Sequence, residues 1–308
     1  MTTSTIDSAS LASFHAHLNK STRILALLGA GLSASSGLPT FRGAGGLWRT
    51  HDSTSLATPE AFHDDPALVW QFYEYRRQMA LSVDPNPAHY ALAELARKVP
   101  GFQALSQNVD GLSQRAEHPP KQLHLLHGTL FDIQCSDRKG CGYSELNFNR
   151  TPITPALAIP TSGVDATSNQ ARMLDISDIN VPLQDGLGWD DLPSCPKCKD
   201  CLMRPGVVWF GESLPPKVLQ TVGAYLRQPE DIDLMLVIGT SAQVQPAAGY
   251  IDAAQNKGAR ICVVNMDEHD KAGTRLGERD WFFRGDAAVI VPELLEPLIG
   301  KVTMPSTT

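Results

Sequence analysis

The sequence lacks the features that direct a chain into a membrane. No apolar run approaches the roughly 18 residues of a membrane-spanning helix. The first 20 residues lack the apolar core of a secretion signal, and Lys20 is their only lysine or arginine, so they also lack the arginines of a transit peptide. We therefore expect no membrane partner, and a location in the cytoplasm or nucleus, or in the mitochondrion if a cryptic signal is present.

Positive charge is also scarce. The 308 residues include 26 lysines and arginines against 33 aspartates and glutamates, which gives a net charge of -7. Nonspecific nucleic-acid binding depends on a basic surface that neutralises phosphates, so direct nucleic-acid binding is not expected. The acidic balance instead fits basic, lysine-bearing protein partners.

Cysteine is infrequent but clustered. Four of the six cysteines form two pairs, Cys135 with Cys141 and, about 55 residues later, Cys195 with Cys198. In an intracellular chain such clusters indicate metal rather than disulfides. Two knuckles of this spacing predict a zinc ribbon, and four thiolate ligands leave no open position, so the metal would hold structure. Cys201, three residues after Cys198, is the alternative ligand, and we take it to be a spare thiol.

The segment from residue 24 to residue 28 is a run of five apolar residues, typical of a buried parallel strand. Gly29 and Gly31 follow at once, and glycine lets a pyrophosphate approach the backbone closely. Residues 30–35 are predicted to open a helix whose N–H groups face the phosphates. The usual third glycine is replaced by Ala34. The pattern thus indicates a nucleotide loop of unusual design and disfavours a redox dehydrogenase.

Strands and helices alternate along the rest of the chain. We predict helices over 59–81, 87–98 and 246–257, and strands over 102–110, 207–210, 234–238 and 261–264. Polar residues follow several of these strands, which is the doubly wound α/β pattern with ligands beyond the strand ends. The proline-rich and aspartate-rich segment 151–190 is predicted to be a long surface insertion.

One polar segment and one histidine stand out. Gln107, Asn108 and Asp110 follow a predicted strand and are too polar for a core, although by themselves they would also suit a turn. His127 precedes a glycine, and histidine suits a general base because its pKa lies near working pH. His124 is the rival for that role.

These motifs resemble those of a known family. The pattern Gly-Ala-Gly-x-Ser-x-x-Ser-Gly-x-Pro-x-Phe-Arg over 29–42 resembles the first signature of the sirtuins, the NAD-dependent protein deacylases. The Gln-Asn-x-Asp segment and the His-Gly pair resemble further signatures, and the likeness covers roughly residues 20–300. It implies an α/β fold with a large Rossmann-like parallel-sheet domain and a small domain that combines a helical insert with a zinc ribbon. NAD and acyl-lysine would meet between them.

The implied domains have the following boundaries. The Rossmann-like NAD-binding domain takes residues 15–45, 92–130 and 204–300. The helical insert of the small domain takes 46–91, and the zinc ribbon takes 131–203 with the long loop 151–190. Residues 1–14 and 301–308 would be flexible tails.

The resemblance also implies a set of NAD-binding residues. They are Gly29, Ala30, Gly31, Ser33, Phe41, Arg42, Gln107, Asn108, Asp110, Gly239, Thr240, Ser241, Asn265, Asp267 and Ala287. Gln107 would contact the ribose, and Asn108 and Asp110 would form the nicotinamide pocket. His127 would be the general base, with Asn108 as the second catalytic residue. Asp267 departs from the family pattern, which has Glu there.

A further set of residues is predicted to bind the acyl-lysine substrate. Tyr73 and Arg76 share one face of a predicted helix. By itself this spacing would also suit an ordinary amphipathic helix with a solvated face. In class III sirtuins such a pair binds the carboxylate of succinyl-, malonyl- or glutaryl-lysine, and a small residue such as Ala57 widens the acyl pocket. A guanidinium fork can hold a carboxylate at two points, and such hydrogen bonds contribute about 1.5–3 kcal/mol. The strand predicted to pair with the substrate peptide contains Val208, Trp209 and Phe210.

The sequence therefore predicts an enzyme that removes acidic acyl groups from protein lysines. The resemblance implies that NAD is consumed, giving nicotinamide and O-acyl-ADP-ribose, and that one structural zinc is bound. A deacetylase or a mono-ADP-ribosyltransferase on the same fold is the alternative. A non-enzymatic NAD- or zinc-binding module is disfavoured because Asn108, Asp110 and His127 are all present.

Overall fold

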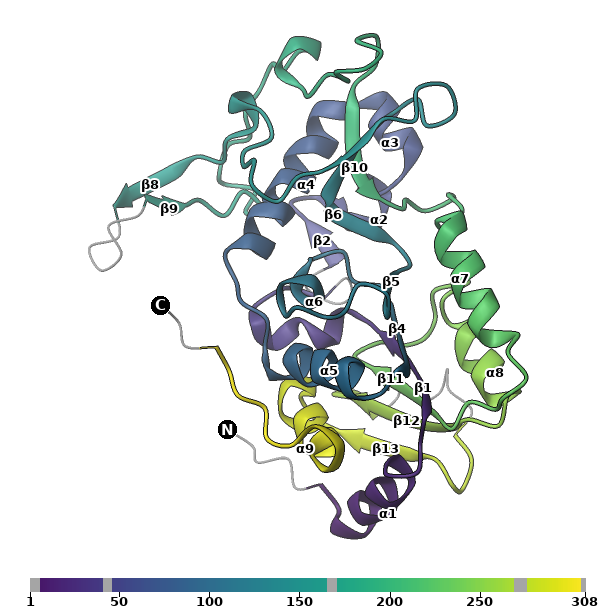
Figure 1. The fold of residues 1–308 in the computed structure, drawn as a ribbon. Helices are drawn as coiled ribbons and strands as arrows, with labels where there is room; N and C mark the ends of the chain where they lie inside the picture. Colours follow the sequence, from purple (N-terminus) through teal and green to yellow (C-terminus); the bar gives the residue numbers. More distant parts are fainter. Residues whose placement is uncertain (1–5, 41–45, 165–170, 269–275, 306–308) are drawn as a thin grey trace. The chain divides into compact units, whose positions relative to one another are not determined.

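The structure is a computed structural model that describes residues 6–40, 46–164, 171–268 and 276–305. The chain divides into two compact units. Figure 1 shows the fold coloured by residue number, from purple at the N-terminus to yellow at the C-terminus. Unit 1 comprises residues 1–40, 83–127 and 214–308, and unit 2 comprises 41–82 and 128–213. In the part of the chain that the structure describes, every helix is too short or too polar to cross a membrane.

Unit 1 is built on a six-stranded sheet in which all neighbouring strands are parallel, in the order β13-β12-β11-β1-β4-β5. Its strands are β1 (Arg23–Leu28), β4 (Gly101–Ser106), β5 (Leu123–Leu125), β11 (Leu234–Ile238), β12 (Arg260–Asn265) and β13 (Trp281–Arg284). The chain adds β4 and β5 on one side of β1, then crosses to the other side for β11 to β13. The strand order therefore reverses between β1 and β11, where α/β sheets bind ligands.

Helices cover the sheet of unit 1 (Figure 1). They are α1 (Ser8–Leu18), α5 (Pro87–Lys98), α6 (Leu112–Arg115), α7 (Pro216–Leu226), α8 (Gly249–Gln255) and α9 (Ala287–Ile299). Alternate residues of β1, Ile24, Ala26 and Leu28, share a hydrophobic core with α1, α5 and α9. The intervening Leu25 and Leu27 are also fully buried. Because successive side chains of a strand point to opposite faces, both faces of this sheet are covered.

Unit 2 combines helices with a small antiparallel sheet. The helices are α2 (Ser53–Leu56), α3 (Pro59–Asp64) and α4 (Pro66–Leu81). The sheet has the order β10-β6-β7, formed by β6 (Gly128–Cys135), β7 (Ser144–Leu146) and β10 (Met203–Val207). Two short hairpins pair β2 (Leu47–Trp48) with β3 (His51–Asp52), and β8 (Thr161–Val164) with β9 (Ala171–Met173). Thr58 and Asp65 cap the N-termini of α3 and α4, and each helix starts with a proline, which accounts for a second helix that begins at Pro66.

The expected α/β class, with one parallel-sheet unit and one cysteine-bearing unit, is confirmed. The units change over at residues 40/41, 82/83, 127/128 and 213/214, several residues from the expected domain boundaries. The whole of α5 belongs to unit 1, because its apolar face, including Leu92 and Leu95, lies in the core of that unit.

Several local predictions were wrong. Residues 30–35 form two 3₁₀ turns, η1 (Ala30–Leu32) and η2 (Ala34–Ser36), which end at Gly37 with φ of 100°. The strand predicted over 207–210 ends at Val207, because the Trp209 amide donates to the Glu212 carboxylate (2.9 Å) and the chain turns there. The strand predicted over 102–110 ends at Ser106. Two elements of the structure, β13 and α7, were not predicted from the sequence.

The insertion 151–190 contains two 3₁₀ turns, η4 (Pro155–Leu157) and η5 (Trp189–Asp191), besides the β8/β9 hairpin. A buried ion pair holds its first residues. Glu74 and Arg77 are fully buried on α4, and Arg77 Nε lies 3.5 Å from Glu74 Oε2. Glu74 accepts from the Thr151 hydroxyl (2.8 Å), and Arg77 donates to the carbonyls of Leu130, Asn147 and Arg150. One charged pair thus fixes β6 and the start of the insertion to α4.

Removing one member of the buried Glu74–Arg77 ion pair should strongly destabilise the protein. We predict that Arg77→Met lowers the free energy of unfolding by about 3–5 kcal/mol, because it leaves the buried Glu74 carboxylate without its counterion. Urea unfolding followed by tryptophan fluorescence measures the loss. Arg150→Met is the matched control, since the Arg150–Glu145 pair is long (3.9 Å) and exposed, and its loss should cost less than about 1 kcal/mol. Equal effects of the two variants would contradict the prediction.

Candidate active site

The turn after β1 lies directly against the turn after β11. Gly31 N donates to Gly239 O (2.8 Å), and Gly29 N donates to Ile238 O (2.9 Å). A Cβ added to Gly29 would lie 2.5 Å from the Cβ of Thr240, and one added to Gly31 would lie 2.7 Å from the Cα of Gly239. Neither contact is sterically possible, so both glycines are required for the two turns to touch. The expected helix with free N–H groups is absent here, because the amides of Gly31 and Leu32 are used within the turns.

A polar network centred on Ser33 lies beside this turn. The Ser33 hydroxyl donates to Asp110 Oδ2 (2.6 Å) and accepts from Asn108 Nδ2 (3.2 Å). It also lies 3.4 Å from Nε2 of His89. Asn108 Nδ2 donates further to Gly29 O (3.0 Å), which ties the polar segment after β4 to the glycine turn.

His89, which the sequence analysis missed, completes this network. The Asn86 backbone N–H donates to Nδ1 of His89 (3.2 Å), so the hydrogen of the neutral ring is on Nε2 and points to Ser33. Burial lowers the pKa of His89 to about 4, although the charge of Asp110 acts in the opposite direction. His89 is therefore neutral near pH 7. The signal in the sequence was the Asn-Pro-x-His start of α5, in which Asn86 and His89 form a capping box.

The ends of three strands meet around Thr240. Gln107 Nε2, after β4, donates to the Thr240 hydroxyl (3.0 Å). Asn265 Nδ2, at the end of β12, donates to the Thr240 carbonyl (3.1 Å). Thr240 itself follows β11, so the polar residues predicted at separate strand ends lie at one edge of the sheet, as the doubly wound pattern requires.

His127 lies in the turn after β5. Its Nδ1 lies 3.1 Å from the carbonyl oxygen of Gln107. Since a carbonyl can only accept, Nδ1 carries the hydrogen and the neutral ring presents an unprotonated Nε2, which is the atom a general base needs. Burial lowers the pKa of His127, partly offset by the hydrogen bond to Gln107. The rival His124 lies within β5, where its Nε2 is 2.6 Å from Gln103 Oε1. The geometry therefore favours His127.

The remaining residues of the predicted NAD set lie in unit 1 or outside the described residues. Ala30 is part of η1, Ser241 follows Thr240, and Asp267 N lies 3.5 Å from the side-chain oxygen of Asn265. Ala287 opens α9, whose cap Asp286 accepts from the Ser35 hydroxyl of η2. Phe41 and Arg42 lie outside the residues that the structure describes.

The predicted substrate residues lie in unit 2, and two pairs of them are joined by hydrogen bonds. Phe210 N donates to the carbonyl of Ala57 (2.9 Å), and Trp209 Nε1 donates to the Tyr73 hydroxyl (2.9 Å). Tyr73 is fully buried, so this face of α4 is not an ordinary solvated surface. Arg76 is half-buried, with its guanidinium 5.4 Å from the centre of the Phe72 ring. Val208 is also half-buried, and it lies between the end of β10 and the aromatic residues Trp209 and Phe210.

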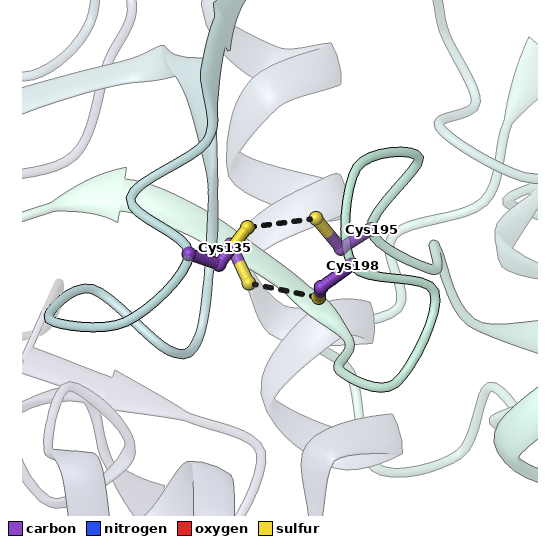
Figure 2. A group of neighbouring side chains, drawn as sticks. Cys135, Cys195 and Cys198 are labelled. Carbon is purple, nitrogen blue, oxygen red and sulfur yellow. Dashed lines mark hydrogen bonds between the residues drawn. The ribbon is translucent and has the colours of Figure 1, made fainter.

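The four predicted zinc ligands converge in unit 2. The Sγ atoms of Cys135 and Cys198 are 3.8 Å apart, those of Cys141 and Cys195 are 3.7 Å apart, and all four lie within 4.8 Å of one another. Figure 2 shows the thiols of Cys195 and Cys198 facing the cysteine sulfurs at the end of β6, where Cys135 is the last residue of the strand. Four sulfurs around zinc at a Zn–S distance of about 2.3 Å are about 3.8 Å apart, so this geometry fits tetrahedral zinc. Cys201 is not part of this group.

We predict that zinc content will depend on these four thiols alone. Cys198→Ala should lose most of the about one zinc per chain that a Cys₄ site binds, and unit 2 should unfold at lower urea concentration, because metal binding contributes directly to folding. Cys201→Ala is the control and should retain full zinc. Elemental analysis of the purified variants measures both, and zinc loss in the Cys201 variant would contradict the assignment.

Comparison with known proteins agrees with this geometry. Residues 29–246 match the model of the Sir2 family. The chain is 43% identical over 304 residues to an NAD-dependent protein deacylase of Candida albicans, covering 95% of this chain and 99% of that one. It is 38% identical to the mitochondrial NAD-dependent protein deacylase sirtuin-5 of Canis lupus familiaris, covering 94% of this chain and 86% of that one. Among solved structures, a Sir2 homolog–NAD complex matches with a TM-score of 0.69 and 33% identity over 96% of this chain and 94% of that one. The family model and these relatives span most of the sequence, including the glycine turn, the Ser33 network and His127, and the chain therefore belongs to the Sir2 family.

Proposed function

We propose that this protein is an NAD-dependent protein-lysine deacylase that prefers acidic acyl groups. The observation that carries the proposal is the convergence in unit 1 of the glycine turn, the Ser33 network and a histidine with a free Nε2. The relatives in Candida albicans and dog bear the name NAD-dependent protein deacylase, and a neighbouring solved structure contains NAD. The mitochondrial label of the dog relative fits one of the compartments expected for this chain.

The residues of unit 1 would bind NAD. Gly29 and Gly31 leave the backbone of the turn open to a pyrophosphate, because no Cβ stands between them and a ligand. Gln107 and Thr240, which already hydrogen-bond each other, present polar groups to a ribose. Asn108 and Asp110, which both hydrogen-bond to Ser33, would form the nicotinamide pocket.

His127 would move the proton in the reaction. NAD supplies the electrophilic C1′ carbon, which the acyl oxygen of the substrate attacks as nicotinamide leaves. Nε2 of His127 then takes a proton from a ribose hydroxyl, and the Gln107 carbonyl keeps Nδ1 protonated so that Nε2 stays the base. After hydrolysis the products are free lysine and O-acyl-ADP-ribose, and no hydride is transferred.

The residues of unit 2 would select the acyl group. The small side chain of Ala57 leaves room for a long acyl chain, and its carbonyl holds Phe210 in the segment that would pair with the peptide. Arg76 offers a guanidinium fork and Tyr73 a hydroxyl to a distal carboxylate. An acetyl group has no carboxylate, so it would gain nothing from this pair.

Removing the Arg76 guanidinium should therefore abolish most of the preference for acidic acyl groups. We predict that the wild-type protein with NAD prefers succinyl-lysine to acetyl-lysine peptides by roughly 10- to 100-fold in kcat/KM, and that Arg76→Met removes most of that preference. A panel of acyl-lysine peptides of one sequence measures this. If acetyl-lysine is processed faster by the wild type, the acidic preference is wrong and a plain deacetylase remains. If ADP-ribose from labelled NAD stays on protein, the activity is ADP-ribosyl transfer.

The pH dependence should report His127. Because burial lowers its pKa, the neutral base persists to lower pH than for a free histidine, and kcat/KM should fall only as pH drops through a midpoint below about 6.5. The profile of kcat/KM for succinyl-lysine peptide measures the midpoint. His124→Gln should keep the acid limb, and His127→Tyr should abolish turnover. A limb that disappears in the His124 variant would assign the base to His124 instead.

A further inference from the structure

The hydroxyl of Tyr73 has one hydrogen-bond partner whose role the proposed function does not explain. The indole Nε1 of Trp209 donates to it over 2.9 Å, and the two rings lie with centroids 6.3 Å apart. Tyr73 is fully buried and Trp209 is 2% exposed. An indole N–H can only donate, so the hydroxyl oxygen accepts in this contact and its own hydrogen is directed elsewhere.

That hydrogen has no acceptor among the residues that the structure describes, where the Tyr73 hydroxyl makes a hydrogen bond with Trp209 alone. A buried hydroxyl usually satisfies both its donor and its acceptor, because an unpaired polar group is costly. Burial also raises the pKa of Tyr73 to about 12, so the hydroxyl keeps its proton at any working pH. Tyr73 is therefore neutral, and its hydroxyl can donate a hydrogen bond while it accepts one from Trp209.

Two charged residues, Arg204 and Glu212, also hold the indole of Trp209 in place. The Arg204 guanidinium stacks on the Trp209 ring, 3.4 Å from its centre. Glu212 accepts two hydrogen bonds from Arg204 (2.7 and 2.9 Å) and one from the backbone N–H of Trp209 (2.9 Å). Arg204 is 4% exposed, so this arrangement is anchored in the interior of unit 2. The indole has little freedom to rotate away from Tyr73.

We propose that Trp209 is a positioning residue for acidic acyl groups, acting through Tyr73. Its N–H occupies the hydroxyl oxygen of Tyr73, so that the hydroxyl hydrogen is already turned toward the acyl carboxylate before the substrate binds. The proposal rests on the proposed deacylase function and adds a specificity residue to it. Preorganisation of this kind raises affinity because the donor loses little rotational freedom on binding. A phenylalanine at position 209 would preserve the stack on Arg204 but not the orientation of the hydroxyl.

The test is a double-mutant cycle on acyl selectivity. The measured quantity is the ratio of kcat/KM for a succinyl-lysine peptide to that for the matching acetyl-lysine peptide. We expect Trp209→Phe to lower this ratio by about tenfold, mainly through KM for the succinyl peptide. In the Tyr73→Phe background, Trp209→Phe should cause no further loss, because the hydroxyl through which it acts is gone.

Two variants control for structural damage. Trp70→Phe removes another buried indole hydrogen bond of unit 2, from Trp70 Nε1 to the carbonyl of Met203 (2.9 Å), without touching Tyr73. Arg138→Gln removes an ion pair to Glu212 (3.0 Å) from a side chain that is 39% exposed, and leaves Arg204 in place. Both should keep the wild-type ratio even if they lower stability.

The outcomes separate the two proposals. If the wild type releases no nicotinamide with any acyl peptide, the deacylase function itself fails. If the wild type prefers succinyl-lysine but Trp209→Phe keeps the wild-type ratio, the positioning role is overturned while the function stands. Losses that add independently in the Tyr73 background overturn it as well, since Trp209 would then act by another route. A tenfold loss that vanishes in that background supports it.

Discussion

The backbone contact between the turns after β1 and β11 is the constraint on which the candidate site depends. Gly29 and Gly31 approach Gly239 and Thr240 so closely that a single Cβ would separate the turns. The contact lies at the point where the strand order of the sheet reverses, and it places the ends of β1, β4, β11 and β12 at one edge. This topology favours a dinucleotide site at that edge, because the ends of the four parallel strands bring their polar residues together there.

The proposed catalytic residues of unit 1 and the proposed acyl-binding residues of unit 2 differ in how fully their hydrogen bonds are satisfied within the protein. In unit 1, Ser33 donates to Asp110 and accepts from Asn108, with His89 held neutral beside it, so that the network has a single arrangement of hydrogens. The same logic fixes the tautomer of His127 through Gln107. In unit 2, the hydroxyl hydrogen of Tyr73 has no acceptor among the described residues. In the proposed mechanism, the base His127 would thus be preset by the fold, whereas the Tyr73 hydroxyl would be satisfied by the acyl carboxylate of the substrate.

Much of this arrangement could be predicted from the sequence, because it depends on short, strongly patterned segments. The zinc ligands follow from cysteine spacing, and β1 and β11 from continuous apolar runs ended by glycine. The capping box at the start of α5 marks His89 in the sequence, but its contact with Ser33, 56 positions away, could not be predicted from that local pattern. The contact of Trp209 with Tyr73 could not be predicted either, because the predicted strand ends before Trp209, whose backbone N–H donates to Glu212. Local pattern gives the elements, but long-range polar contacts decide which side chains meet.

The central claim is that one site in unit 1 cleaves NAD in step with the removal of an acyl group. The most direct measurement is product stoichiometry by mass spectrometry, with succinyl-lysine peptide and NAD as substrates. We predict about one nicotinamide and one O-succinyl-ADP-ribose for each lysine freed, as one coupled cleavage requires. Nicotinamide released without freed lysine, or NADH formed in place of nicotinamide, would contradict it.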